Sequence, residues 1–220
     1  VKFQTFNTEN LALKKTPKAS YQLRSKNDTE SHFEMLKKLE LSKADHKNLI
    51  KYCKKKGIDF ISTPYDIESA KFLNSLDIDA IKVASADLTD SFLHEYLSKI
   101  DKKIIISTGM SNINEIKETL KIYRHKLHNI SILHCVSNYP CSFSSLNMNC
   151  LDRLKKFNCE IGFSDHSHGY MASIVAISKG AKIIEKHITI DNKLPGPDHK
   201  SSLNLKNFKV FLDKIKEANI

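Results

Sequence analysis

The chain has 220 residues, which is enough for one large domain with its own hydrophobic core. Apolar residues make up 40% and charged residues 27%, which excludes disordered and collagen-like sequences. The formal net charge is +10, and no apolar run reaches the roughly 20 residues that a membrane helix needs.

The charge is concentrated near the start of the chain, where the first 57 residues hold 14 Lys and Arg against six Asp and Glu. Many of these lysines fall at helical spacing, including Lys47, Lys51, Lys54 and Lys55, and indicate the solvated face of a helix that also attracts anionic substrates. Nucleic-acid binding is the weaker interpretation because no aromatic residues are interleaved with the basic ones.

Short apolar runs recur along the chain and predict strands at Val1–Thr5, Ile58–Ser62, Ala80–Ala84, Lys103–Ser107, Ile130–Cys135, Glu160–Phe163 and Lys182–Ile188. Helical periods lie between them. One helix starts at the capping pair of Ser42 and Asp45 and stops at Gly57, another follows Ser111, another ends at Gly180, and the last begins at Leu205. Apolar strands that alternate with amphipathic helices predict a parallel sheet covered by helices.

Seven strands and a terminal helix are one β-α unit short of an eight-fold barrel. Nearly every predicted strand ends in residues that can bind or react, as expected for a barrel, whose strand ends meet at one mouth. An open sheet with a glycine-rich nucleotide motif is excluded because neither GxGxxG nor GxxxxGK[ST] occurs. We therefore predict an α/β fold, a (β/α)8 TIM barrel, in which residues 1–220 form strands two to eight and the first unit is missing.

Residues 7–41 separate the first strand from the next long helix and are too many for an ordinary connection. We expect this segment to be a substrate lid or a subunit contact, with a short helix around Phe33–Leu39. The five cysteines are odd in number and lack CxxC spacing, so we expect reduced thiols in a cytoplasmic protein. Cys53 and Cys135 lie in apolar segments and are predicted to be core residues.

His166 and His187 end the last two strands, which lie about 4.8 Å apart in a sheet. Both imidazoles could therefore share a divalent ion, with Asp165, Glu185 or water completing the shell. The alternative is two hydrogen-bonded histidines without a metal. The acidic residues near each histidine, Asp165 and Glu185, favour the metal site over this alternative.

Lys2 and Lys82 lie within strands, where a charge needs a partner. Together with nearby hydroxyls they predict a site for a phosphorylated, carboxylated substrate, although either lysine could instead be a Schiff-base nucleophile or a lysine that extends to solvent. After the last strand, Asp198 lies in a stiff Pro-Gly-Pro turn and is a candidate carboxylate for sugar hydroxyls.

Nine collinear segments resemble the sialic acid synthase family and cover the whole chain. They are Val1-Lys2-Phe3-Gln4-Thr5-Phe6, Ser62-Thr63-Pro64-Tyr65-Asp66, Ile81-Lys82-Val83-Ala84-Ser85, Ser107-Thr108-Gly109-Met110, Leu133-His134-Cys135, Ser137-Asn138-Tyr139-Pro140, Gly162-Phe163-Ser164-Asp165-His166, Glu185-Lys186-His187 and Gly196-Pro197-Asp198-His199-Lys200. The resemblance implies a barrel that condenses phosphoenolpyruvate with an N-acetylmannosamine-type sugar, releasing phosphate and giving a nonulosonic acid.

The resemblance also implies roles for individual residues. His166 and His187 would bind a divalent ion, usually Mn, with Mg or Co as alternatives. Lys2, Thr63, Lys82, Ser85, Ser107, Ser137 and Ser164 would hold phosphoenolpyruvate. Gln4, Tyr139, Glu185 and Asp198 would contact the sugar or its developing charge. The family resemblance further implies a homodimer.

Some features depart from the family pattern. Ser137 stands where some members carry Asn, and Asp87 where others carry Glu. From the resemblance we also expect this chain to lack the family's first strand and its C-terminal antifreeze-like domain. We expect this chain alone to be a barrel with an open seam and little turnover. The alternatives are another metal-dependent phosphoenolpyruvate or aldol condensation and a non-catalytic barrel fragment. The sugar itself is left open among N-acetylmannosamine, its 6-phosphate and diacetamido-trideoxy sugars.

Overall fold

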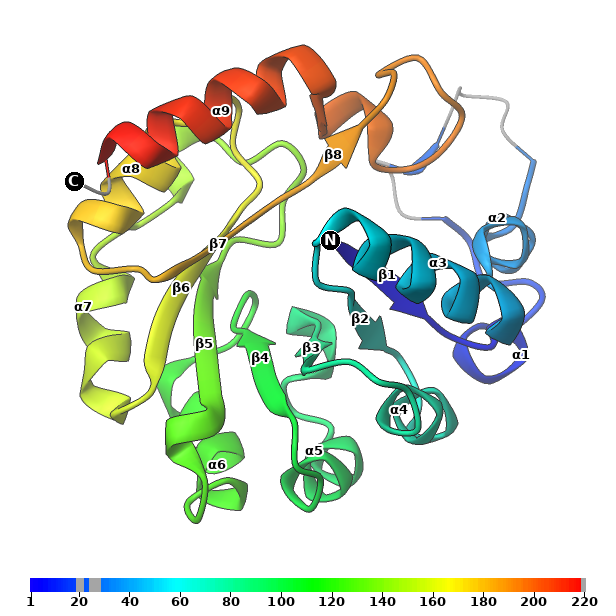
Figure 1. The fold of residues 1–220 in the computed structure, drawn as a ribbon, viewed down its shortest axis with the longest axis horizontal. Coiled ribbons are helices and arrows are strands. Elements are labelled where there is room, and N and C mark those ends of the chain that lie inside the picture. Colours follow the sequence, from blue (N-terminus) through cyan, green and yellow to red (C-terminus); the bar gives the residue numbers. More distant parts are fainter. Residues whose placement is uncertain (19–21, 24–28, 219–220) are drawn as a thin grey trace.

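A computed structural model describes residues 1–18, 22–23 and 29–218 of the chain. Seven parallel strands form one curled sheet in which spatial order follows chain order, with helices on its outer side (Figure 1). The strands are β1 (Lys2–Thr5), β2 (Ile61–Pro64), β3 (Ala80–Val83), β4 (Lys103–Ser107), β5 (Ile130–Cys135), β6 (Glu160–Asp165) and β7 (Ile183–Lys186). The prediction of a parallel sheet covered by helices is confirmed.

The helices differ in length, and the longest two are α3 and α9. Their bounds are α1 (Thr8–Leu11), α2 (His32–Leu39), α3 (Lys43–Lys56), α4 (Ile67–Asn74), α5 (Ser91–Ser98), α6 (Ile113–Ile122), α7 (Cys150–Leu154), α8 (Met171–Ser178) and α9 (Leu205–Ala218). The Ser42–Asp45 capping box starts α3, and Gly57 ends it in a left-handed conformation, as predicted. The cap of α6 is Asn112 rather than Ser111, because the Asn112 side chain accepts the backbone N–H groups of Asn114 and Glu115.

The main core lies between the outer face of the sheet and the helices. Ile104, Ile106, Ile130 and Ile132 are buried there from the two central strands, with Tyr123 beyond the end of α6. Because successive side chains along a strand point to opposite faces, the residues between these core positions point into the curl of the sheet. A second, smaller apolar cluster fills the curl near the beginnings of the strands; it contains Ala80, Ile105 and Leu133, with Ile61 and Ile183 packed against it.

Several strand boundaries differ by a few residues from the sequence-based prediction, and two differences have a clear structural reason. The second strand begins at Ile61 rather than at Ile58, because the Ile58 N–H still bonds the Cys53 carbonyl and closes the end of α3. The last predicted run divides at His187. Its first part is β7, and its second part is β8 (Ile188–Thr189), which pairs with β9 (Leu203–Asn204) in a separate two-stranded sheet.

The segment between β1 and α3 contains two of the helices. A short helix was predicted around Phe33–Leu39, and α2 confirms it with a capping box between Ser31 and Glu34. Residues 19–21 and 24–28 of this segment lie outside the described part of the chain. Within the described remainder, the start of α1 is joined to the end of α2, because Thr8 donates hydrogen bonds from its amide and its hydroxyl to Glu40.

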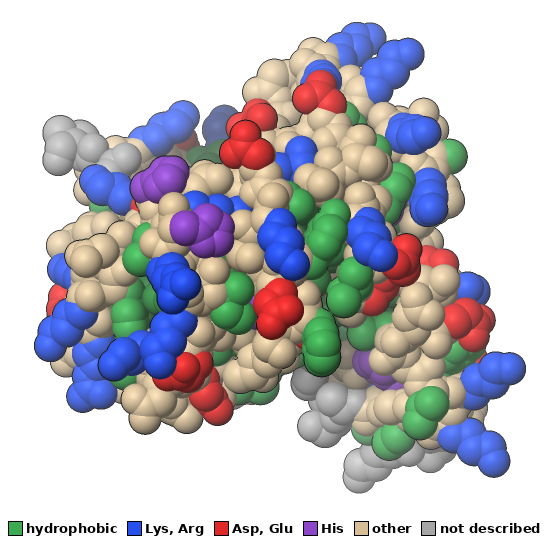
Figure 2. Space-filling view, turned by 90° about the horizontal axis from the view of Figure 1, so that it is seen from below, with side chains coloured by type: hydrophobic (Ala, Val, Ile, Leu, Met, Phe, Trp, Pro, Cys, Tyr) green, Lys and Arg blue, Asp and Glu red, His purple; other side chains and the backbone are tan. Residues whose placement is uncertain are grey.

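Basic and acidic side chains are interspersed on the molecular surface with patches of hydrophobic residues, as one face shows (Figure 2). The α3 lysines Lys47, Lys51, Lys54 and Lys55 are exposed, which confirms the prediction of a solvated helix face. All five cysteines are free, and Cys53 and Cys135 are buried as predicted. Among the described residues, no helix combines the length and the apolar character needed to cross a bilayer.

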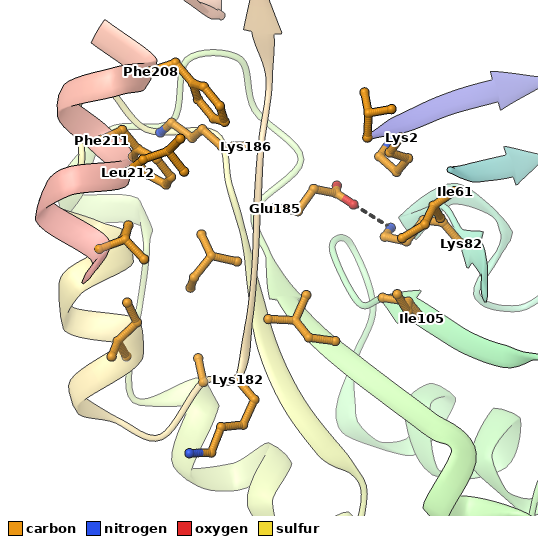
Figure 3. Close-up of a pocket in the computed structure, with 16 residues that line it drawn as sticks. Lys2, Ile61, Lys82, Ile105, Lys182, Glu185, Lys186, Phe208, Phe211 and Leu212 are labelled. Atoms are coloured by element: carbon orange, nitrogen blue, oxygen red, sulfur yellow. Dashed lines mark ion pairs between the residues drawn. The ribbon is translucent and has the colours of Figure 1, made fainter. Parts of the chain in front are cut away.

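The two outermost strands of the sheet, β1 and β7, face each other across a groove. In the described part of the chain, neither strand has a sheet partner on this side. The groove has a volume of about 470 Å³ and is lined by β1, β7 and α9. Figure 3 shows Lys2 and Glu185 on its two sides and the α9 residues Phe208, Phe211 and Leu212 at its rim.

Candidate active site

A cavity of about 520 Å³ lies at the carboxyl ends of the strands. Strand alternation places polar residues there, because each lies two positions after a residue of the apolar cluster in the curl: Thr63 after Ile61, Lys82 after Ala80, and Glu185 after Ile183. The structure brings thirteen of the sequence-predicted site residues to this one cavity: Lys2, Gln4, Thr63, Lys82, Ser85, Ser107, Ser137, Tyr139, Ser164, His166, Glu185, His187 and Asp198. Their individual roles stay predictions. Asp165, which was also considered for the metal shell, does not line the cavity and instead pairs with Lys186.

Lys82 is the most deeply buried charged group of the cavity, with only 3% of the residue exposed. Its ammonium group donates to Ser107 Oγ at 2.6 Å and to the Val83 carbonyl at 3.0 Å. Burial lowers the pKa of Lys82, an effect that the carboxylate of Glu185 opposes and the charge of Lys2 reinforces. A buried ammonium group with one carboxylate nearby is suited to receive an anionic ligand.

Glu185 is that carboxylate, and its Oε2 lies 3.7 Å from Lys82 Nζ across the curl (Figure 3). Its Oε1 accepts a hydrogen bond from Ser164 Oγ at 2.8 Å. Burial raises the pKa of Glu185, but the charges of Lys82 and Lys2 and the Ser164 hydroxyl outweigh burial and bring it to about 2. Glu185 is therefore ionised at neutral pH.

Hydroxyl groups and a glycine form a small cradle next to Lys82. The Gly109 amide donates to Ser85 Oγ at 3.0 Å. A β-carbon on Gly109 would lie 2.5 Å from Ser137 Oγ and 2.9 Å from Ser85 Oγ, so glycine keeps this space open. Several hydroxyl donors beside an ammonium group are the groups that bind phosphate and carboxylate oxygens.

The aromatic ring of Tyr139 and the imidazole rings of His166 and His187 line the other side of the cavity. The ring of Tyr139 lies 4.0 Å from that of His166 and 5.4 Å from that of His187, and the two imidazoles are 5.5 Å apart, centroid to centroid. His166 Nδ1 donates to the Val136 carbonyl at 2.7 Å, so the lone pair of the neutral ring is on Nε2, which lies 3.4 Å from Ser164 Oγ. Burial lowers the pKa of His166 to about 4, so its imidazole is neutral near pH 7.

Of the two imidazoles, that of His166 has the features expected of a metal ligand. A metal-binding histidine needs a neutral ring with its other nitrogen bonded to the protein, and His166 has both features. Asp198 is adjacent, because its Oδ2 lies 3.5 Å from His187 Nδ1. No group of three or more His, Cys, Asp or Glu side chains, however, converges on a common metal position among the residues that the structure describes. The described side chains thus supply two candidate ligands and leave the others to water or substrate.

Three more predicted residues line the cavity from the first two strands. Gln4 of β1 and Thr63 of β2 are register partners, and Lys2 lies two positions before Gln4 on the same side. Thr63 is buried and Lys2 is half-buried, whereas Gln4 is exposed. Lys2 and Lys82 thus bring two ammonium groups to one cavity from strands that are not neighbours.

Sequence reasoning gave no site role to Asp87 or Cys135, although both line the cavity. Asp87 Oδ2 is buried and is without a hydrogen-bond partner among the described residues. Burial, reinforced by Asp90, raises the pKa of Asp87 to about 6. Cys135 is buried, but it faces the cavity, two positions after Leu133. The period-two alternation of β5 was the signal that could have placed it there.

The segment before α3 also contributes to the cavity, with Leu11, His32, Met35 and Leu36 among its lining residues. The expectation of a lid over the mouth agrees with this position. A contact with another subunit stays a prediction.

A curled parallel sheet with helices outside and a polar cavity at the carboxyl ends of its strands defines a TIM-barrel-like α/β domain. The chain belongs to the NeuB family, whose model matches residues 1–220.

Similar proteins carry names from nonulosonic acid synthesis. The chain is 41% identical to N,N'-diacetyllegionaminic acid synthase of Campylobacter jejuni, matching 99% of this chain and 66% of that protein. It is 37% identical to the N,N'-diacetyllegionaminic acid synthase of Legionella pneumophila, covering 99% and 63%. The chain therefore spans slightly less than two thirds of the length of these relatives. The sialic acid synthetase structure from Leptospira borgpetersenii, determined with citrate, is 29% identical with a TM-score of 0.86, covering 99% of this chain and 72% of that one.

Proposed function

We propose that this chain is the barrel part of a nonulosonic acid synthase, which condenses phosphoenolpyruvate with an N-acetylmannosamine-type sugar and releases phosphate. One observation carries the proposal: a single cavity joins a half built from lysines and hydroxyls to a half built from a tyrosine, two histidines and a carboxylate. The family membership and the names of the relatives support it.

The first half suits phosphoenolpyruvate, which carries a phosphate and a carboxylate. The ammonium groups of Lys2 and Lys82 balance these charges, and the second lysine is already desolvated and oriented by Ser107. The remaining contacts in this proposal come from hydroxyl groups, those of Thr63, Ser85, Ser107, Ser137 and Ser164.

The second half suits the open-chain sugar. Gln4, Tyr139, Glu185 and Asp198 contact its hydroxyls or the charge that develops on it. In the reaction, C3 of phosphoenolpyruvate forms a bond to the aldehyde carbon, whose oxygen takes up a proton. Water then adds at C2, and the C2–O bond to phosphate breaks. Because Glu185 is ionised, it stabilises the cation that develops at C2 before water adds.

A divalent ion, Mn in this proposal with Mg or Co as alternatives, would be bound by His166 and His187, and when bound it supplies Lewis-acid polarisation of the aldehyde and orients the attacking water. The chain's own contribution is the fixed ring geometry described above. His166 remains neutral because it is buried, so it offers a lone pair rather than a positive charge.

The groove between β1 and β7 bears on the completeness of this domain. In the proposal, the chain supplies strands two to eight of a (β/α)8 barrel, and the groove is the place of the remaining strand. The chain alone is then expected to have little activity. A homodimer of the full-length protein and a cytoplasmic location belong to the same proposal.

The test is phosphate release by the gene product that contains this chain. Phosphoenolpyruvate is supplied with N-acetylmannosamine, its 6-phosphate or a diacetamido-trideoxy sugar, with and without Mn. Release that depends on both sugar and metal, and that is lost in His187→Ala, supports the proposal. His128→Ala is the matched control, because His128 is an exposed histidine in the turn before β5.

The choice of sugar is an outcome of the same experiment. Activity with the diacetamido sugar alone would place this protein with the two relatives named legionaminic acid synthases. A folded protein that binds Mn but releases no phosphate with any of the three sugars would contradict the proposed function.

A further inference from the structure

The two candidate metal ligands are each preceded by a buried charged residue on the opposite side of the sheet. β6 ends in Ser164-Asp165 before His166, and β7 ends in Glu185-Lys186 before His187. Strand alternation directs Ser164 and Glu185 into the curl, where they bond each other. Figure 3 shows the opposite direction for the intervening residue: Glu185 points towards Lys82, and Lys186 points towards α9.

Asp165 and Lys186 are register partners on neighbouring strands and form an ion pair. Lys186 Nζ lies 3.1 Å from Asp165 Oδ2, and the exposed fractions of the two side chains are 3% and 0%. Because burial of a charged pair costs desolvation free energy, a contribution to stability does not by itself explain why the pair is there. Its other contacts indicate what it does.

The pair is bonded to the backbone around His166. Asp165 Oδ1 accepts the amide of Ser167 at 2.8 Å and its hydroxyl at 2.7 Å, while Lys186 Nζ donates to the Ser167 carbonyl. Asp165 Oδ2 also accepts the hydroxyl of Ser173 in α8 at 2.6 Å. The residue after His166 is thus held at both its N–H and its C=O by side chains from two strands.

The histidines themselves are anchored through their carbonyl groups. The His166 carbonyl accepts the Cys141 amide, and the His187 carbonyl accepts the Leu203 amide, both at 2.9 Å. Each backbone is therefore fixed on one side by such a bond and on the other by a member of the ion pair. The two rings, whose centroids are 5.5 Å apart, follow directly on the ends of β6 and β7, which the ion pair joins at the last residue pair of their register.

We propose that Asp165 and Lys186 are a positioning pair that holds the rings of His166 and His187 at the separation needed to share one ligand; for a metal ligand this rests on the proposed function. Neither residue touches the cavity that holds the predicted substrate groups. The pair acts through the backbone of the two strand ends and through the Ser167 turn.

The test replaces Lys186 with methionine, which removes the charge and keeps much of the side-chain volume. Asp165 retains three hydrogen-bond donors in Lys186→Met, so we expect the fold to persist. Mn affinity, measured without substrate from the paramagnetic signal of free Mn, should fall at least tenfold, as when an outer partner of a metal ligand is lost. The nitrogen and proton NMR signals of the two imidazoles in the metal-free protein should also shift.

Lys103→Met is the matched control, because Lys103 forms an ion pair with Glu160 at 2.7 Å at the other end of the same sheet. It should leave both readouts unchanged. Ser173→Ala removes one bond to Asp165 and leaves both charges in place, so it should move both readouts in the same direction by less. This variant also keeps the test open if Lys186→Met does not fold.

The outcomes separate the two proposals. Unchanged imidazole signals together with unchanged Mn affinity in a folded Lys186→Met would overturn the positioning pair. If the unaltered protein binds no Mn, the metal part of the proposed function fails, and the imidazole signals alone decide whether the pair positions the rings. Changes in Lys103→Met equal to those in Lys186→Met would also refute the inference, since they would reflect general loosening of the sheet.

Discussion

Replacing Glu185 with glutamine should remove a pH-dependent part of the stability. The lysines and Ser164 depress the pKa of Glu185 from 4.5 to about 2 despite its burial. Since one pKa unit is worth about 1.4 kcal/mol, the ionised carboxylate contributes about 3 kcal/mol to the free energy of unfolding at pH 7. A carboxyl group whose pKa is lower in the folded than in the unfolded state stabilises the folded state at pH values above its unfolded-state pKa. For Glu185 this contribution is therefore complete above about pH 4.5, and it is lost as the pH falls towards 2.

About 1 kcal/mol of the contribution should remain at pH 3, so the stability difference between the unaltered chain and Glu185→Gln should shrink by about 2 kcal/mol between pH 7 and pH 3. Urea unfolding at the two pH values measures it. Glu118→Gln is the control, because Glu118 pairs with Lys121 on the exposed face of α6. A Glu185→Gln difference that is the same at both pH values within about 0.5 kcal/mol would refute the electrostatic account of this cavity.

Three further predictions concern the cavity and the sheet. Gly109→Ala should raise the KM for phosphoenolpyruvate at least tenfold with little loss of stability, because the added methyl group meets the movable Ser137 and Ser85 hydroxyls; steady-state kinetics and thermal melts check this. Gly162→Ala should lower stability by more than about 2 kcal/mol, since its β-carbon would lie 2.5 Å from the Ile183 backbone oxygen; a soluble variant of unchanged melting temperature would contradict this. Asp87→Asn should stabilise the chain by about 1–2 kcal/mol at pH 8 and by less at pH 4. The reason is that burial raises the pKa of Asp87 to about 6 in the folded state, so its ionised form destabilises the folded state at higher pH. Urea unfolding at both pH values tests the sign.

Much of the fold could be predicted from the sequence because each strand is a short apolar run. The strands at Lys103–Ser107 and Ile130–Cys135 have the predicted bounds. The second strand was displaced because Ile58 is apolar, although 51% of it is exposed and its amide closes a helix. Periodicity does not report such a local hydrogen bond.

The candidate site was predictable as a set because the strand ends of a curled parallel sheet meet. That argument places His166 and His187 together without fixing the direction of either ring. Asp87 was not assigned a role because its raised pKa depends on burial by segments far away in the sequence. The pairing of Asp165 with Lys186 depends on register, and a shift of one residue would have separated them.

The agreement between chain order and strand order has a consequence for how the molecule folds. From β3 to β7, each strand pairs with the strand that immediately precedes it in the chain, so the sheet can form in chain order. The contact between Lys82 and Glu185 is different, because it joins β3 to β7 across the curl. During synthesis the sheet can therefore grow strand by strand, while the cavity becomes complete only after β7 and the later turn that contains Asp198 have emerged.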